Sequence, residues 1–302
     1  MLVVNSLLKP PSGGGLGDFI RGSLGCLKIC NKLGYDFTIF LKNHPVGKHF
    51  KPSQYDTPFI YDKPFNCVSE TLDLFQKYHK PEELMVFLKN QNRIIRRNRG
   101  NDVLSICTNL LIDDFKITNE ERSFVSSFFE FNEETRKRVS FELIDNNVEY
   151  ECIHIRCGDY IAFNICNNHF KDEDKEVFKV FEKLENEIIQ ILNNTSKPVV
   201  LISDSESIRD ELSKKLNLVS PKTNTYHSAF RKHNCIDMLK DLHILRNCTK
   251  IYQLTNSFHW WGSGFSQIAS RLDNIPIIHL KYSIRQIPFS WMPETWISPP
   301  FY

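Results

Sequence analysis

The second half of the chain alternates short apolar runs with helical patterns, an order that few folds accommodate. Apolar runs lie at 151–156, 198–203, 250–254 and 275–280, and between them apolar residues recur at the spacing of an amphipathic helix. Strands that alternate with helices pair in parallel, because each helix returns the chain to the same end of the sheet. This half therefore predicts a doubly wound α/β sheet, in which ligands bind at the carboxyl ends of the strands.

The start of the chain predicts a second unit of the same kind. An apolar run at 2–8 precedes the glycine-rich stretch 10–18, and a helical pattern then runs to Gly34 and an apolar run at 37–41. This order of strand, glycine loop, helix and strand is typical of a βαβ unit.

Between these units the pattern is less regular. We expect a helix at 82–99, a strand at 103–107, and helices at 119–129 and 133–144. The arginines that end the first of these helices are either a phosphate or acceptor patch or a solvated helix end favoured by the helix dipole.

A chain of 302 residues exceeds what one core usually serves, so two domains are expected. We place the boundary in the polar stretch 145–149. The prediction is a Rossmann-like domain at 1–147, a second at 148–285, and a tail at 286–302 that packs back over the junction.

Composition excludes several classes of protein. Lys+Arg 38 against Asp+Glu 36 leaves a net charge of +2, too balanced for a protein that depends on nucleic acid or anionic membrane. No run approaches the roughly 18 to 20 apolar residues of a membrane span. The N-terminus lacks the basic region and long apolar core of a signal peptide, so we expect a cytoplasmic protein. Nine cysteines without a Cys-x-x-Cys pair predict reduced thiols in a core.

The glycine-rich stretch fits neither common phosphate-binding motif. Gly15-x-Gly17 is followed by Ile20 where a dinucleotide-binding loop needs a third glycine, and a P-loop Gly-Lys-Ser/Thr is missing. This argues against a nicotinamide dehydrogenase and an ATPase. Gly14, Gly15 and Gly17 still lie at a helix N-terminus, where free N–H groups favour an anion or a polar sugar. Alternatively, the glycines form only a turn and Asp18 only caps the helix.

Polar residues follow the central strands of the second half. The run 151–156 carries His154 and ends at Arg156, so it delivers a fixed guanidinium to the strand end, a group suited to phosphate. Asp204 follows the run 198–203. It is either a cap of the next helix or a carboxylate that contacts a ribose or base.

A third polar group lies near the end of the second half. Asp241 falls in a helical pattern, and Asn256, Ser257 and Phe258 follow the next strand. Polar groups that open a helix after a strand make an anion-binding terminus. For Trp260 and Trp261, packing in the core or between domains is the favoured reading.

Together these stretches resemble one family. The three segments are Gly14-Gly15-Leu16-Gly17-Asp18, then His154-x-Arg156-x-Gly158-Asp159, and last Asp241 with Asn256-Ser-Phe-x-Trp-Trp-Gly262. They resemble, in the same order, motifs of the GT-B fucosyltransferases that make α-1,2, α-1,6 and protein O-linked fucose.

The resemblance implies two Rossmann-like domains facing a central cleft, with GDP-fucose as donor substrate and no metal or other cofactor. By position, Arg156 would bind the β-phosphate and stabilise the leaving GDP, and His154 would contact the nucleotide. Asp241 would hydrogen-bond guanine N1 and N2. The phosphates would also be contacted by the residues after the strand, Asn256, Ser257 and Phe258. The acceptor would be a glycan hydroxyl.

Two positions depart from the family pattern. Asp18 stands where asparagine is common, and a carboxylate there could deprotonate the acceptor hydroxyl. Cys157 stands where many members have a second arginine, which leaves the phosphate contacts and the sugar open. We therefore predict Arg156 and Asp18 as catalytic residues. The alternatives are another nucleotide sugar on the same fold, or a non-catalytic nucleotide- or glycan-binding module.

Overall fold

The structure is a computed structural model of the whole chain. It describes 1–7, 15–41, 44–51, 71–74, 77–78, 80–97, 103–109, 117–156, 174–223, 235–256 and 263–282. Our predictions for Gly14, Ser257, Phe258 and the tail 286–302 lie outside the described residues.

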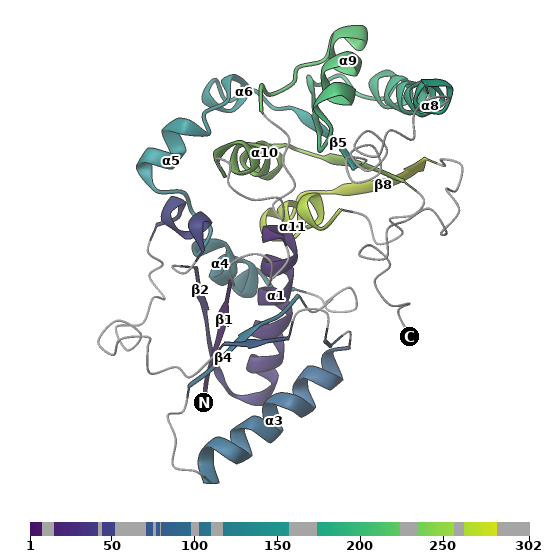
Figure 1. Cartoon of the computed structure of the whole chain (residues 1–302). Helices are drawn as coiled ribbons and strands as arrows, with labels where there is room; N and C mark the ends of the chain where they lie inside the picture. The colour runs from purple at the N-terminus through teal and green to yellow at the C-terminus, as the bar shows by residue number, and fades with distance from the viewer. Residues whose placement is uncertain are drawn as a thin grey trace.

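Two separate parallel sheets form the frame of the molecule (Figure 1). The first has the order β2-β1-β4-β3, built from β1 (Leu2–Ser6), β2 (Asp36–Phe40), β3 (Leu72–Asp73) and β4 (Val103–Cys107). The second has the order β6-β5-β7-β8, built from β5 (Glu151–Arg156), β6 (Val199–Ser203), β7 (Ile251–Asn256) and β8 (Ile277–Tyr282). The predicted α/β architecture with a parallel sheet in each half is confirmed.

Ten described helices connect and cover the strands. They are α1 (Leu16–Leu33), η1 (Pro45–His49), α3 (Pro81–Arg97), α4 (Asn119–Ser127), α5 (Glu133–Arg138), α6 (Glu142–Asp145), α8 (Asp174–Asn193), α9 (Glu206–Leu216), α10 (Ile236–Asn247) and α11 (Gly264–Asp273). Below, the first sheet with α1 to α6 is called the N-terminal half, and the second sheet with α8 to α11 the C-terminal half.

The prediction of a single helix at 133–144 is wrong. The pattern at 133–144 predicts one helix, but the structure has two, α5 and α6. Val139 and Phe141 are both buried, and Phe141 is extended (φ −143°, ψ 128°), so the chain turns into the core between the helices. The Ser140 hydroxyl donates to the carboxylate of Asp145, the last residue of α6.

The second sheet carries helices on both faces. Leu184 and Ile188 of α8 and Leu212 of α9 pack with strand residues on one face, and residues of α10 and α11 pack on the other. This confirms the doubly wound arrangement for the C-terminal half. The core under α10 and α11 is continuous with the core of the N-terminal half, so one hydrophobic cluster crosses the junction.

The first sheet presents a different composition on each face. Val3 and Ile39 pack toward α1, and the amide of Asn5 on the same face donates to Ser23 of α1 at 2.9 Å. The opposite face carries small polar side chains, with Ser6 and Ser105 hydrogen-bonded to each other at 2.9 Å. Both serines are buried, so the pair satisfies groups that would otherwise be costly inside the protein.

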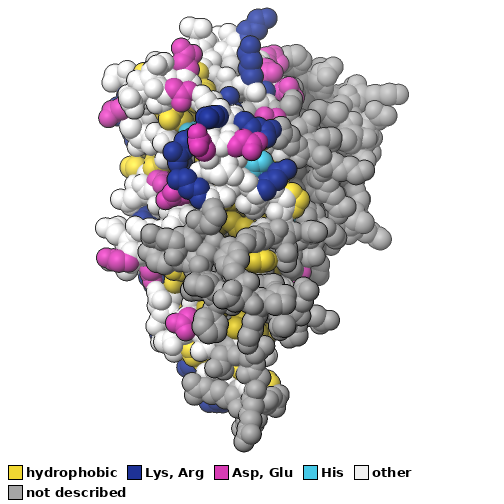
Figure 2. Space-filling model, turned by 90° about the vertical axis from the view of Figure 1, so that its left-hand side faces the viewer, with side chains coloured by type: hydrophobic (Ala, Val, Ile, Leu, Met, Phe, Trp, Pro, Cys, Tyr) yellow, Lys and Arg dark blue, Asp and Glu magenta, His cyan; other side chains and the backbone are white. Residues whose placement is uncertain are grey.

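The surface and the cysteines agree with the composition. Acidic and basic side chains are interspersed over the described part of the face in Figure 2, as the small net charge suggests. Within α5, Lys137 pairs with Glu133 at 3.2 Å, one helical turn away. None of the described cysteines forms a disulfide.

Candidate functional site

The carboxyl edge of the second sheet contains a topological switch point between β5 and β7. From β5 the chain crosses to β6 on one side, and from β7 it crosses to β8 on the other. The intervening helices lie on opposite faces, because α8 belongs to one core cluster and α11 to the other. Such a point leaves a crevice at the carboxyl ends of the strands, where open α/β sheets bind their ligands.

Arg156 lies at this switch point. It is the last residue of β5 and stands opposite Thr255 of β7 in the parallel register. Its Nη1 lies 2.8 Å from Oδ2 of Asp204, which follows β6, and the two side chains are 21% and 16% exposed. The hydroxyl of Tyr282, the last residue of β8, donates to the Arg156 carbonyl at 3.2 Å. Asp204 thus holds the partly exposed guanidinium, and Tyr282 fixes the backbone at the end of β5.

Asp204 was predicted either to cap the next helix or to contact a ribose or base, and its position argues against the cap. Ser205 is the N-cap residue of α9 and makes no side-chain cap, so Asp204 lies before the cap position. Its carboxylate is directed to Arg156. A contact of Asp204 with a ribose or base stays a prediction.

His154 is buried beneath the strand end. Its Nδ1 lies 2.9 Å from Oγ of Ser266 in the first turn of α11. Burial lowers its pKa to about 4; the charge of Arg156 acts in the same direction, while that of Asp204 opposes it. The ring is therefore neutral at neutral pH and joins β5 to α11. The predicted contact with a nucleotide stays a prediction.

A polar network that the sequence did not reveal extends this contact. Gln253 of β7 donates through Nε2 to the Ser263 carbonyl at 2.9 Å and also to the Ser266 hydroxyl. Its Oε1 accepts a hydrogen bond from His279 Nδ1 at 2.6 Å. Gln253 is fully buried, so the network fixes the start of α11 against the sheet.

The glycine loop leads into the N-terminus of α1. Gly15 is the N-cap residue and offers no side-chain cap, and Asp18 already lies inside the helix, so the reading of Asp18 as the cap is wrong. The Asp18 carboxylate instead accepts a hydrogen bond from Nη2 of Arg21 at 2.7 Å. Arg21 is buried, and within the described residues its Nε has no partner.

The N-termini of α1 and α11 touch each other. A Cβ added to Gly17 would lie 3.0 Å from the backbone carbon of Gly264 and from the nitrogen of Phe265. A Cβ added to Gly264 would lie 3.1 Å from Oδ1 of Asp18. Only glycine at both positions allows this approach without a shift, so the first sequence motif meets the start of α11.

Asp241 belongs to a second polar cluster. It is buried in α10 and accepts a hydrogen bond from the Thr223 hydroxyl at 3.1 Å. Burial raises its pKa to about 7, although this hydrogen bond and the charge of Arg209 act in the opposite direction. Arg209, which the sequence analysis missed, donates to the Thr223 hydroxyl at 3.0 Å.

The structure therefore brings part of the predicted set together. Arg156 and Asp204 form one pair, and Asp18 and Gly17 meet the start of α11, which also holds His154. Asp241 lies in its own cluster with Thr223 and Arg209. Asn256 is the last residue of β7 and pairs in register with Tyr282.

In the described ranges no group of three His, Cys, Asp or Glu side chains lies close enough together to hold a metal ion. None of the described helices is long and apolar enough to cross a membrane.

Comparisons with known proteins give similarity at the level of structure. The sequence matches no protein-family model and no curated protein. Among solved structures, it is similar to the NodZ alpha-1,6-fucosyltransferase soaked with GDP-fucose, with a TM-score of 0.48 and 14% identity over 92% of this chain and 94% of that one. Fucosyltransferase NodZ from Bradyrhizobium gives a TM-score of 0.47 at the same identity and coverage. Because these TM-scores lie below 0.5, the functional argument rests on the site and the motifs.

Proposed function

We propose that the protein is an inverting, metal-independent glycosyltransferase of the GT-B type that acts in glycan biosynthesis. It would transfer fucose from GDP-fucose to a hydroxyl of a glycan acceptor. The observation that carries this proposal is the position of Arg156, a partly exposed guanidinium at the switch point of a parallel sheet. A guanidinium there suits the diphosphate of a nucleotide sugar, and its motif resembles that of the fucosyltransferases.

The donor would be held from the C-terminal half. Arg156 would contact the β-phosphate, and Asp204 would orient the guanidinium through the 2.8 Å ion pair. Asp241 would accept hydrogen bonds from guanine N1 and N2, with Thr223 holding one carboxylate oxygen. His154, neutral and buried, would position the strand end through Ser266.

The reaction would be a single displacement. The acceptor oxygen attacks C1 of fucose from the face opposite GDP, and a new C1–O bond forms as the C1–O bond to the β-phosphate breaks. The bonding electron pair leaves with GDP, where Arg156 offsets the growing charge. The acceptor proton passes to the carboxylate of Asp18, which Arg21 orients from the same helix. One displacement inverts the anomeric centre.

The test replaces Arg156 by alanine and by lysine. Losing a preorganised contact of this kind costs about 10²–10³-fold in kcat, and lysine cannot restore the planar fork. Fucose transfer from GDP-fucose to a glycan panel is measured, with product linkage read by NMR. Arg138→Ala, which removes a guanidinium paired within α5, is the matched control. Near-normal transfer by a folded Arg156→Ala protein would overturn the proposal.

The alternatives give different results in a nucleotide-binding panel. Stabilisation by GDP and not by UDP supports the role of Asp241, because only guanine offers the matching pair of donors. Preference for UDP indicates another nucleotide sugar. Binding of GDP with neither transfer nor donor hydrolysis indicates a non-catalytic module.

A further inference from the structure

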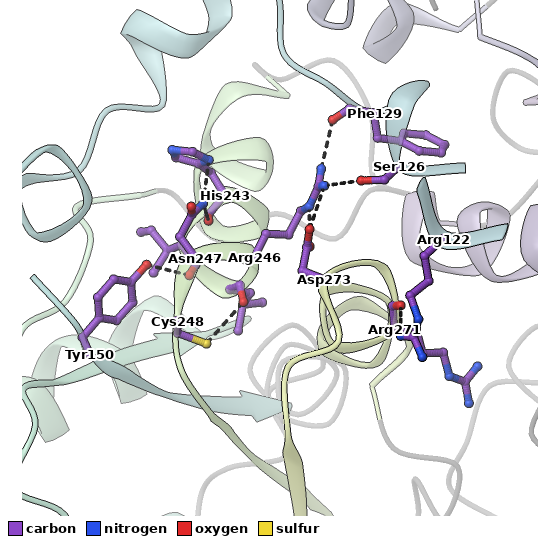
Figure 3. A network of polar contacts seen from close by, with 12 residues as sticks. Arg122, Ser126, Phe129, Tyr150, His243, Arg246, Asn247, Cys248, Arg271 and Asp273 are labelled. Atoms are coloured by element: carbon purple, nitrogen blue, oxygen red, sulfur yellow. Dashed lines mark hydrogen bonds and ion pairs between the residues drawn. The ribbon is translucent and has the colours of Figure 1, made fainter. Parts of the chain in front are cut away.

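The guanidinium of Arg246 lies between the two halves of the molecule. Figure 3 shows this side chain, from the last turn of α10, reaching toward α4 and α11. Its Nε donates to Oδ2 of Asp273 at 2.7 Å and its Nη2 to Oδ1 at 3.1 Å. The same Nη2 donates to the Ser126 hydroxyl at 2.7 Å, and Nη1 donates to the Phe129 carbonyl at 3.0 Å.

These contacts divide between the halves. Asp273 ends α11 in the C-terminal half, whereas Ser126 lies in the last turn of α4 and Phe129 follows that helix in the N-terminal half. The Arg246 side chain is 14% exposed and all three of its nitrogens are used. A bidentate pair with a carboxylate fixes the plane of a guanidinium, so Asp273 aims the remaining donors at α4.

A second arginine crosses the junction in the opposite direction. Arg122 of α4 donates through Nη1 to the carbonyl of Arg271 at 2.6 Å. This carbonyl lies in the last turn of α11, where free carbonyl groups and the helix dipole favour a cation. The C-terminal end of α11 is therefore tied to α4 through two separate guanidinium groups.

Apolar contacts follow the same junction. The hydrophobic cluster that includes Leu24 of α1 also includes Leu242 of α10 and Ile268 of α11. The ring of Phe131 meets that of His243 edge to face at 5.6 Å. Together with the contact of Gly17 and Gly264, these interactions hold α10 and α11 against the N-terminal half.

We propose that Arg246 is a positioning residue that locks the two halves into one rigid unit, so that GDP binds without closure of one half onto the other. It acts by fixing α11 against α4, and thereby fixes the distance between Asp18 and Arg156. The statements about GDP binding and about catalysis rest on the proposed function, whereas the rigid junction does not.

The first experiment measures rigidity, and its recording without GDP assumes nothing about function. Fluorescent labels are placed at two exposed positions, Lys89 in α3 and Lys214 in α9, through non-canonical amino acids because the chain has nine cysteines. Single-molecule energy transfer is recorded with and without GDP. The expected result is one narrow distance distribution that GDP leaves unchanged. A shift to a shorter distance on adding GDP would overturn the proposal.

Variants then test Arg246 itself. Arg246→Ala should broaden the distance distribution and split the single unfolding transition into two, and Ser126→Ala should do the same more weakly. Lys215→Ala, which removes a 2.6 Å ion pair to Glu185 inside the C-terminal half, is the matched control and should do neither. If Arg246→Ala does not fold, the result for Ser126→Ala still tests whether this contact locks the two halves together. A narrow distribution with one transition in Ser126→Ala and in any folded Arg246→Ala protein would refute the lock.

Kinetics separate the lock from the proposed reaction. In Arg246→Ala we expect kcat for fucose transfer to fall about tenfold or more, because small misplacements of reacting groups are costly. The Kd for GDP should change less than about threefold, and Arg246→Lys should recover part of the rate. If the wild-type protein transfers no fucose, the distance and unfolding measurements stand on their own. Wild-type transfer with an unaltered kcat in Arg246→Ala would refute the positioning role alone.

Discussion

Asp241→Asn should be more stable than the wild-type protein by a margin that grows as the pH rises. The same substitution should abolish binding of GDP. Asp241 is 8% exposed and its pKa is raised to about 7 by burial. Above this pH the folded protein keeps a buried carboxylate with only partial compensation from Thr223 and Arg209. Asparagine has the same shape and keeps the acceptor for Thr223, but it never carries a charge.

The sign follows from proton binding. Between the ordinary pKa of 3.8 and the folded value of about 7, the folded state binds more protons at Asp241 than the unfolded state does. The contribution of Asp241 to the free energy of unfolding therefore falls as pH rises through this window, by about 1.4 kcal/mol per pH unit and on the order of 4 kcal/mol in total. Because asparagine does not titrate, Asp241→Asn removes this dependence of the free energy of unfolding on pH.

Two histidines affect the pH dependence of stability in the opposite direction. The pH profile of the wild-type protein alone therefore does not isolate the contribution of Asp241. Burial lowers the pKa of both His154 and His243 to about 4. Their contribution is present above pH 6.5 and is lost as the pH falls toward 4. Both histidines remain in the variant, so the difference between the two proteins cancels them.

The assay is urea unfolding of both proteins at pH 5, 6, 7 and 8. The stability of Asp241→Asn minus that of wild type should grow by about 2.5 kcal/mol between pH 5 and pH 8. GDP should raise the melting temperature of wild type and not that of Asp241→Asn. A difference between Asp241→Asn and wild type that is the same at pH 5 and pH 8 would show that Asp241 does not titrate in this window.

Three glycine substitutions test the packing of α1 and the approach of α11 to it. Gly22→Ala would place a Cβ 1.8 Å from the carbonyl oxygen of Thr108, so α1 must move, and we expect a loss of about 3 kcal/mol in the free energy of unfolding measured with urea. Gly34→Ala, at φ 67° with open space around it, is the control and should cost about 1 kcal/mol. Equal losses in the two variants would contradict the reasoning. Gly264→Ala would place a Cβ 3.1 Å from Oδ1 of Asp18, so it should lower kcat for transfer about tenfold while the Kd for GDP changes little. A larger effect on GDP affinity than on kcat would place the disturbance at the donor instead.

Much of the fold could be read from the sequence because central strands of parallel sheets are continuous apolar runs. The strands at 103–107 and 151–156 begin and end where the pattern predicts. The last strand was expected at 275–280 and is found at Ile277–Tyr282, because Tyr282 belongs to the apolar core and extends the strand. The two-residue β3 was missed, since an edge strand of that length has no periodicity to detect.

The candidate site was less predictable because its partners come from distant parts of the chain. The position of Arg156 followed from the end of an apolar run, but its pairing with Asp204 depends on which strands are neighbours. Arg209 carries no motif, and only the fold brings it to Thr223 and Asp241. Long arginine side chains reach several positions from one backbone site, so sequence spacing does not identify their partners.

The two groups predicted to carry the reaction lie in different halves, and α11 joins them by contact. Arg156 ends the strand in which His154 lies two residues earlier, and His154 is hydrogen-bonded to Ser266. Two residues before Ser266, Gly264 lies against the carboxylate of Asp18. A strand end and one helical turn therefore set the spacing between the proposed leaving-group cation and the proposed base. Since guanidinium groups from α4 and α10 tie the other end of α11 to the N-terminal half, that spacing is set by the fold before any substrate binds.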